Sequence, residues 1–304
     1  MKPVASPETI GPATSAVEAP PAGPRRTMSP LMVRVLSAAV LVAVLLSSLV
    51  AGPTVALPVL TILIMVGTWE YYAITRRMGV AAAPWVLFPL TLVLLFRFQI
   101  DAVSPQLVPL ALTIAIGAGL AVYLVARQPV DGMSRWAMAI AGSLYIGWML
   151  GFYFALYTAH EPDPARIGTA LLLALAGSTV LGDTAALLAG TRFGRHSFFP
   201  GISPHKTVEG AVAGFVVQAL VFSCLGLLAD IPVGHGVVLG AMVALAAQAG
   251  DLVESQFKRA AKVKDAGNLV PGHGGMLDRI DSLILIPAVA YYYLELVLHV
   301  KLPQ

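Results

Sequence analysis

The sequence predicts an all-α membrane protein, a polytopic bundle of about nine transmembrane helices with a cytoplasmic N-terminus. Of its 304 residues 58% are hydrophobic and only 12% are charged, and the mean hydropathy is +0.81. Apolar runs long enough to cross a hydrocarbon layer of about 30 Å recur along the chain. Because backbone groups in lipid must be paired within their own segment, and no ~10-residue alternating pattern is present, these runs predict helices.

Nine spans follow from the apolar runs. They are predicted at residues 33–51, 54–74, 84–100, 106–126, 136–157, 167–190, 210–229, 236–253 and 281–299. Residues 1–30 are rich in Pro, Ala, Ser and Thr and cannot bury a core, so we expect a disordered cytoplasmic tail. Residues 31–166 then form an N-terminal transmembrane region, and residues 167–304 form a C-terminal one.

The distribution of basic residues sets the orientation of the spans. With the N-terminus inside, 16 of the 19 Lys and Arg residues fall on the inner side, and Arg97, Arg166 and Lys301 fall outside. The positive-inside rule therefore predicts a multi-pass protein of the cell membrane with its C-terminus outside. Residues 191–209 and 250–282 both lie on the predicted cytoplasmic face.

Residues 250–282 contain a cluster of charged residues, which is unusual in so apolar a sequence and requires an explanation. Glu254 and Ser255 follow Asp251 at i+3 and i+4, and Lys258 lies four residues after Glu254, so the four share one helical face. Carboxylates and a hydroxyl at this spacing can hold a divalent cation through oxygen ligands. The alternative is a solvated helix end with an ordinary Glu254–Lys258 pair.

A glycine-rich turn and a second acidic helix end follow in the same stretch. The turn is Pro271-Gly272-His273-Gly274-Gly275, and its N–H groups can form an anion-binding nest. Asp278, Asp281 and Ser282 come next, at i, i+3 and i+4. Carboxylates, cations and backbone donors together suit metal-assisted phosphoryl transfer. A zinc site at His273 is not supported, so we expect backbone packing or phosphate contact there.

Two further features are predicted at the same face. Asp183 lies about seven residues, or roughly 10 Å, from the inner end of its span, and an acid at that depth usually marks a site. The alternative for Asp183 is a helix–helix hydrogen bond to a residue such as Ser178. The loop 191–209 contains Ser203, His205 and Lys206, and its alternative is an ordinary basic loop with a Ser-Pro turn.

Taken together, these motifs resemble the signature of the phosphatidate cytidylyltransferase (CDP-diacylglycerol synthase) family. The resemblance rests on Ser255-x-Phe257-Lys258-Arg259, on Lys264-Asp265-x-Gly267, and on Pro271-Gly272-His273-Gly274-Gly275-x-x-Asp278-Arg279-x-Asp281. Upstream it includes Asp183-Thr184, Gly194-Arg195-His196 and Ser203-Pro204-x-Lys206-Thr207-x-Glu209-Gly210. It covers residues 167–300, whereas the earlier spans agree only in being hydrophobic.

The resemblance implies transfer of the cytidylyl group of CTP to phosphatidic acid, giving CDP-diacylglycerol and diphosphate, with Mg²⁺ at the cytoplasmic face. Residues 167–304 would then be the catalytic region. The implied catalytic residues are Asp183, Asp251, Lys258 and Asp278, and the implied metal ligands are Asp251, Glu254, Asp278 and Asp281. The implied substrate-binding residues are Ser203, Lys206, Arg259, Lys264, His273, Gly274, Gly275 and Arg279.

Two other functions stay open on the sequence. A related enzyme could use CTP to phosphorylate a lipid alcohol, and a transporter would also contain intramembrane acids such as Asp183. A transporter, however, predicts polar residues spread through the depth of the bilayer, whereas here they crowd one face. The expected partners are CTP, phosphatidic acid and membrane lipids, and nucleic acid is not expected. A homodimer and a second cation beside Mg²⁺ are left open.

Overall fold

The structure is a computed structural model that describes residues 30–125, 129–158, 164–267 and 274–303. Helices α1 (Pro30–Val50), α2 (Pro53–Arg77), α3 (Pro84–Leu95), α4 (Arg97–Asp101), α5 (Leu107–Val125), α6 (Pro129–Gly142) and α7 (Met149–Thr158) form the first half. Helices α8 (Pro164–Phe193), α9 (Val208–Gly226), α10 (Val233–Ala260), α11 (Leu277–Ile284) and α12 (Ile286–Leu296) form the second. The predicted helical fold is confirmed. The predicted tail, apart from Pro30, lies outside the described residues.

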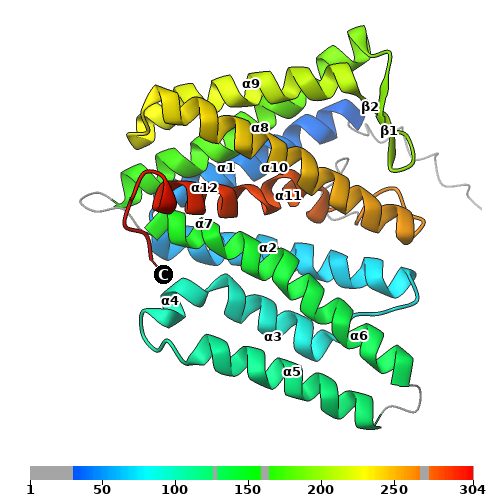
Figure 1. The fold of residues 1–304 in the computed structure, drawn as a ribbon. Helices are drawn as coiled ribbons and strands as arrows, with labels where there is room; N and C mark the ends of the chain where they lie inside the picture. Colours follow the sequence, from blue (N-terminus) through cyan, green and yellow to red (C-terminus); the bar gives the residue numbers. More distant parts are fainter. Residues whose placement is uncertain (1–29, 126–128, 159–163, 268–273, 304) are drawn as a thin grey trace, which may run out of the picture.

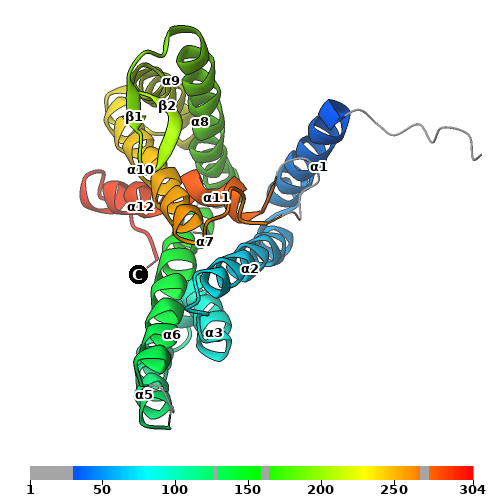
Figure 2. The same ribbon diagram turned by 90° about the vertical axis from the view of Figure 1, so that its right-hand side faces the viewer.

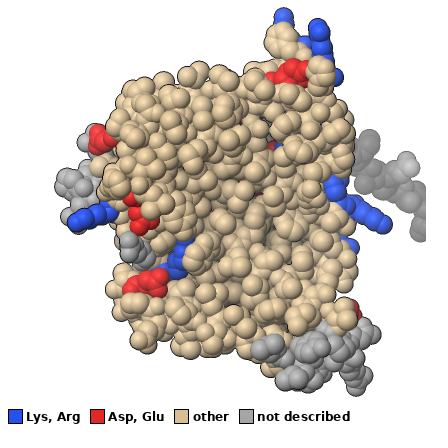
Figure 3. Space-filling view, viewed as in Figure 1, with Lys and Arg blue, Asp and Glu red and all other residues tan. Residues whose placement is uncertain are grey.

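Several helices match the dimensions of a bilayer. Among the described residues, five helical segments are long and apolar enough to cross a membrane: 53–77, 130–158, 167–193, 208–229 and 233–260. Apolar helices at 36–50, 84–95 and 107–119 are shorter. The broad face in Figure 3 is almost free of charge, and Lys, Arg, Asp and Glu gather near its left and right edges. The chain is thus a membrane protein, and the count of nine spans and its orientation stay predictions.

The helices form two groups joined by a central layer. Figure 1 shows α8, α9 and α10 together at the top and α3, α5 and α6 at the bottom, with α7, α11 and α12 between them. Viewed along the helices, α1 stands apart from both groups (Figure 2). One apolar core joins α7, α8, α10 and α12 through residues such as Phe152, Leu175 and Val243. A second joins α2, α3, α7 and α11 through Tyr71, Leu87 and Leu277.

Two predicted spans are interrupted in the structure. The span predicted at 84–100 is divided at Phe96 into α3 and α4, where Arg97 turns its guanidinium back to the carbonyl oxygens of Leu94 and Trp148. The span predicted at 281–299 is divided into α11 and α12 at Leu285, and α11 already begins at Leu277. Pro287 accounts for the second break, because it lacks the N–H that a continuous helix requires.

The predicted loop 191–209 contains a short antiparallel hairpin. Strand β1 (Ser197–Phe199) pairs with β2 (Ser203–Thr207), with Ser197 opposite Thr207. Glu209 fixes the base of the hairpin by accepting hydrogen bonds from the backbone N–H groups of Arg195 and His196. Thr207 then caps α9, since its hydroxyl accepts a hydrogen bond of 3.1 Å from Gly210 N–H. The hairpin therefore holds Lys206 directly before α9.

Candidate active site

The C-terminal part of α10 supplies the acids and the lysine that the sequence places on one face. The Ser255 hydroxyl donates to Asp251 at 3.4 Å, and Lys258 forms an ion pair with Glu254. The Glu254–Lys258 pair of the alternative interpretation is therefore present, but the Glu254 side chain is fully buried, with 0% exposure, so the pair is not solvated. Lys258 and Arg259 lie in the last turn, where cations also interact favourably with the helix dipole.

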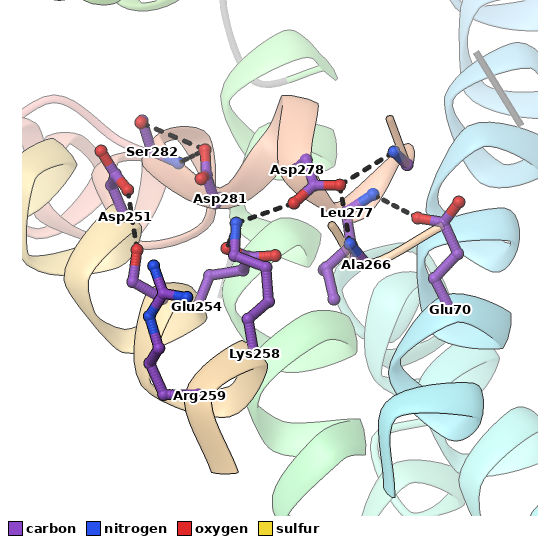
Figure 4. A network of polar contacts seen from close by, with 12 residues as sticks. Glu70, Asp251, Glu254, Lys258, Arg259, Ala266, Leu277, Asp278, Asp281 and Ser282 are labelled. Carbon is purple, nitrogen blue, oxygen red and sulfur yellow. Dashed lines mark hydrogen bonds and ion pairs between the residues drawn. The ribbon is translucent and has the colours of Figure 1, made fainter. Parts of the chain in front are cut away.

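Asp278, in the first turn of α11, is the most highly connected acid of the site (Figure 4). Its Oδ1 accepts a hydrogen bond of 2.7 Å from Lys258 Nζ. Its Oδ2 accepts from the backbone N–H groups of Ala266 at 2.9 Å and Gly275 at 2.8 Å. Burial raises the pKa of Asp278, but these donors outweigh it and hold the pKa below its usual value. Asp278 therefore joins α10 and α11 to the backbone of Ala266 and Gly275 as a carboxylate.

Residues from three other positions complete the cluster. Lys206 of β2 forms an ion pair with Asp251, which joins the hairpin to α10. Asp251 also lies close enough to Asp183 of α8 and Asp281 of α11 for repulsion between the carboxylates. Ser178 instead donates to the carbonyl oxygen of Leu175 in its own helix, so it does not hold Asp183. The acids predicted from separate motifs thus meet in one place.

The remaining predicted residues lie around this cluster and differ in their contacts and in their exposure to solvent. Arg259 donates from Nε to the carbonyl oxygen of Ile202 at 3.0 Å, and so fastens the hairpin to α10. Lys264 and Arg279 are exposed, and Ser203 is half-buried at the start of β2. Gly274 has a φ of 82°, which favours glycine, and a Cβ there would lie 3.1 Å from Asp278 Oδ2. His273 lies outside the described residues.

Glu70 of α2 is a site residue that the sequence interpretation missed. Its Oε2 accepts a hydrogen bond of 2.7 Å from the backbone N–H of Leu277, at the start of α11 (Figure 4). Its carboxylate packs against Gly267 and Gly275, which leave no room for a side chain. Glu70 is buried, with 5% exposure, inside an otherwise apolar span, and that isolated acid was the available signal.

Gly250 permits the close approach of α10 to α11. A Cβ at this position would overlap the carbonyl oxygen of Asp281 and lie 3.4 Å from its carbonyl carbon. We expect Gly250→Ala to separate the helices, lowering activity and costing about 1–3 kcal/mol of stability. Gly234→Ala on the same helix is the matched control, because nothing lies within 4 Å of a Cβ there. Thermal unfolding and turnover of both purified variants test this, and equal behaviour would contradict it.

The residues fit a divalent cation by donor type and charge. Five carboxylates gather around two lysines, and Oε1 of Glu254 is buried without a hydrogen-bond partner. Mg²⁺ prefers oxygen ligands and surplus negative charge of this kind. Lys206 pairs with Asp251, and Lys258 pairs with Glu254 and Asp278. Among the described residues, no three acidic, His or Cys side chains are grouped closely enough to hold a metal ion as they stand. A cation would therefore take over contacts that the lysines now make.

The chain is similar in sequence to several known proteins. The chain is 30% identical to a phosphatidate cytidylyltransferase of Synechocystis over 88% of this chain and 97% of the relative. It is 30% identical to one from Staphylococcus aureus over 84% and 96% of the two chains. A third, from Bacillus subtilis, is 40% identical over 38% of this chain and 43% of its own. The cytidylyltransferase family matches residues 32–297, and the chain belongs to that family.

Proposed function

We propose that this protein transfers the cytidylyl group of CTP to phosphatidic acid, forming CDP-diacylglycerol and diphosphate for phospholipid synthesis. The observation that carries the proposal is the convergence of two ion pairs, Lys206–Asp251 and Lys258–Asp278, in one polar cluster from β2, α10 and α11. The relatives named phosphatidate cytidylyltransferase support the choice of substrates. The excess of basic residues on one side of the spans supports an active site on the cytoplasmic face of the cell membrane.

The proposed reaction is an in-line displacement at phosphorus. A phosphate oxygen of phosphatidic acid attacks the α-phosphorus of CTP, the bond to the β-phosphate oxygen breaks, and diphosphate leaves. Because phosphatidate is already ionised at neutral pH, the step needs no strong general base. Its difficulty lies in bringing two polyanions together, which positioning and positive charge relieve.

The residues of the cluster divide this work between them. Asp251, Glu254, Asp278 and Asp281 would hold Mg²⁺, which supplies charge neutralisation at the phosphates. Lys206 and Lys258, which pair with these carboxylates in the structure, would contact phosphate oxygens of the substrates through their ammonium groups. Lys264 and Arg279 add exposed positive charge beside the glycine-rich loop. Asp183 adds negative charge on the α8 side.

Product analysis tests the proposal directly. Purified protein with CTP, phosphatidic acid and Mg²⁺ should release diphosphate and form CDP-diacylglycerol, and removal of the metal with EDTA should stop the reaction until Mg²⁺ is restored. A CTP-dependent lipid-alcohol kinase would instead release CDP when supplied with a polyprenol. Formation of CDP with no diphosphate would overturn the proposed reaction. Diphosphate release that persists in EDTA would overturn the role of the metal.

A further inference from the structure

A cavity of about 620 Å³ lies at the opposite end of the bundle from β1 and β2 (Figure 1). It is bounded by α4, the start of α5, the junction before α7, and α12. Val108, Leu112 and Phe152 make part of its wall apolar, whereas Arg97 brings a positive charge and Asp101 and Glu295 bring negative charges into it. Figure 3 shows acidic and basic atoms near the left edge of the view, on the side where α4 and α12 lie in Figure 1.

Arg97 is buried in the wall of this cavity, where its guanidinium group contacts three aromatic rings and two carbonyl oxygens. The side chain is buried, with 3% exposure, and its guanidinium carbon lies 4.1–4.2 Å from the ring centroids of Phe98, Trp148 and Phe152. Nη1 donates to the carbonyl oxygens of Leu94 and Trp148. Nη2 is buried without any hydrogen-bond partner. A buried charged donor without an acceptor raises the free energy of the folded protein, so we expect a bound ligand to supply the acceptor.

Asp101 lines the same cavity and supplies a negatively charged hydrogen-bond acceptor. It lies one helical turn after Arg97 on α4, and its Oδ1 is buried without a hydrogen-bond partner. The ion pairs between described residues do not join Asp101 to Arg97. A buried cation and a partly buried carboxylate that line one cavity without forming an ion pair fit a ligand that carries both charges. An anion alone would satisfy Arg97 but be repelled by Asp101.

We propose that this cavity binds one phospholipid with a zwitterionic ethanolamine head group. A phosphate oxygen accepts a hydrogen bond from Nη2 of Arg97, and the ammonium group donates to Oδ1 of Asp101. Ethanolamine fits better than choline because a quaternary ammonium has no N–H to donate. The apolar wall formed by Val108 and Leu112 accommodates the upper acyl chains. The site is separate from the carboxylate cluster of α10 and α11.

Native mass spectrometry of the full chain in detergent tests the proposal. Phosphatidylethanolamine, phosphatidylcholine and phosphatidylglycerol with identical acyl chains would be titrated separately. We expect one phosphatidylethanolamine per chain, bound at least tenfold more tightly than either of the other lipids. Equal retention of the three lipids would overturn the proposal.

Two variants locate the binding without removing Arg97 from its aromatic surroundings. Leu112→Trp should fill the cavity and abolish the tight binding, whereas Leu110→Trp is the matched control because Leu110 is 52% exposed on the same helix. Asp101→Asn should remove the preference for phosphatidylethanolamine over phosphatidylglycerol. Unchanged melting temperature and diphosphate release would show that each variant is folded. Full binding by Leu112→Trp, or an unchanged preference in Asp101→Asn, would contradict the site.

Discussion

Asp278→Asn should reduce diphosphate release from CTP by at least about 10²-fold, the scale expected when charge stabilisation is removed from a catalytic centre. Asp278 accepts from three donors, Lys258 on Oδ1 and the N–H groups of Ala266 and Gly275 on Oδ2. An Asn side chain has one acceptor and one donor at these positions. Whichever way the amide is turned, its NH₂ group faces a donor, so either Lys258 or the loop is displaced.

Asp230→Asn is the matched control for this variant. It makes the same chemical change at an exposed residue with φ 58°, a conformation that Asn tolerates, at the turn before α10. Turnover should be near normal there. Near-normal turnover of Asp278→Asn, in protein that is correctly inserted, would refute the role of Asp278 in the site.

The stability of the Asp278 network should also depend on pH. Because the pKa of Asp278 is lowered in the folded protein, its contribution is fully present above the ordinary carboxyl pKa of about 3.9 and is lost as pH falls through the lowered value. The melting temperatures of the wild type and Asp278→Asn should therefore differ most near neutral pH and converge in acid. A difference that stays constant down to about pH 3 would contradict this linkage.

Glu70→Ala should lower turnover by about tenfold or more, the cost of a lost supporting contact at a catalytic site. The substitution leaves the Leu277 N–H buried without an acceptor, which costs about 1–3 kcal/mol, and removes the packing against Gly267 and Gly275. The start of α11, which carries Asp278, then loses its attachment to α2. Glu70 acts through Asp278 as a positioning residue.

Glu70→Gln separates positioning from charge. The amide oxygen of Gln can still accept from Leu277 N–H, so we expect this variant to keep most of the turnover that Glu70→Ala loses. Thr61→Ala is a control on the same helix, because Thr61 donates only to the carbonyl oxygen of Leu57 in its own turn. Equal losses in the Gln and Ala variants would show that the carboxylate charge, rather than the hydrogen bond, is required.

The amino-acid sequence was enough to predict the helical membrane fold and the family. Long apolar runs without an alternating pattern predict helices in lipid. Steps of four and three residues put Asp251, Ser255 and Lys258 on one face, because helix geometry is local. The motif resemblance named the family from short segments of fixed spacing. Each of these inferences depends on neighbours in the chain.

Tertiary structure alone decided which of these residues meet. The pairs Lys206–Asp251 and Lys258–Asp278 join segments 45 and 20 residues apart, and Glu70 reaches Leu277 across 207 positions. No local pattern encodes such contacts, because they depend on how whole helices pack. Packing likewise left Arg97 and Asp101 facing one cavity without forming an ion pair. The local sequence therefore determines which side chains share a helix face, and the packing of the helices determines which residues that face contacts.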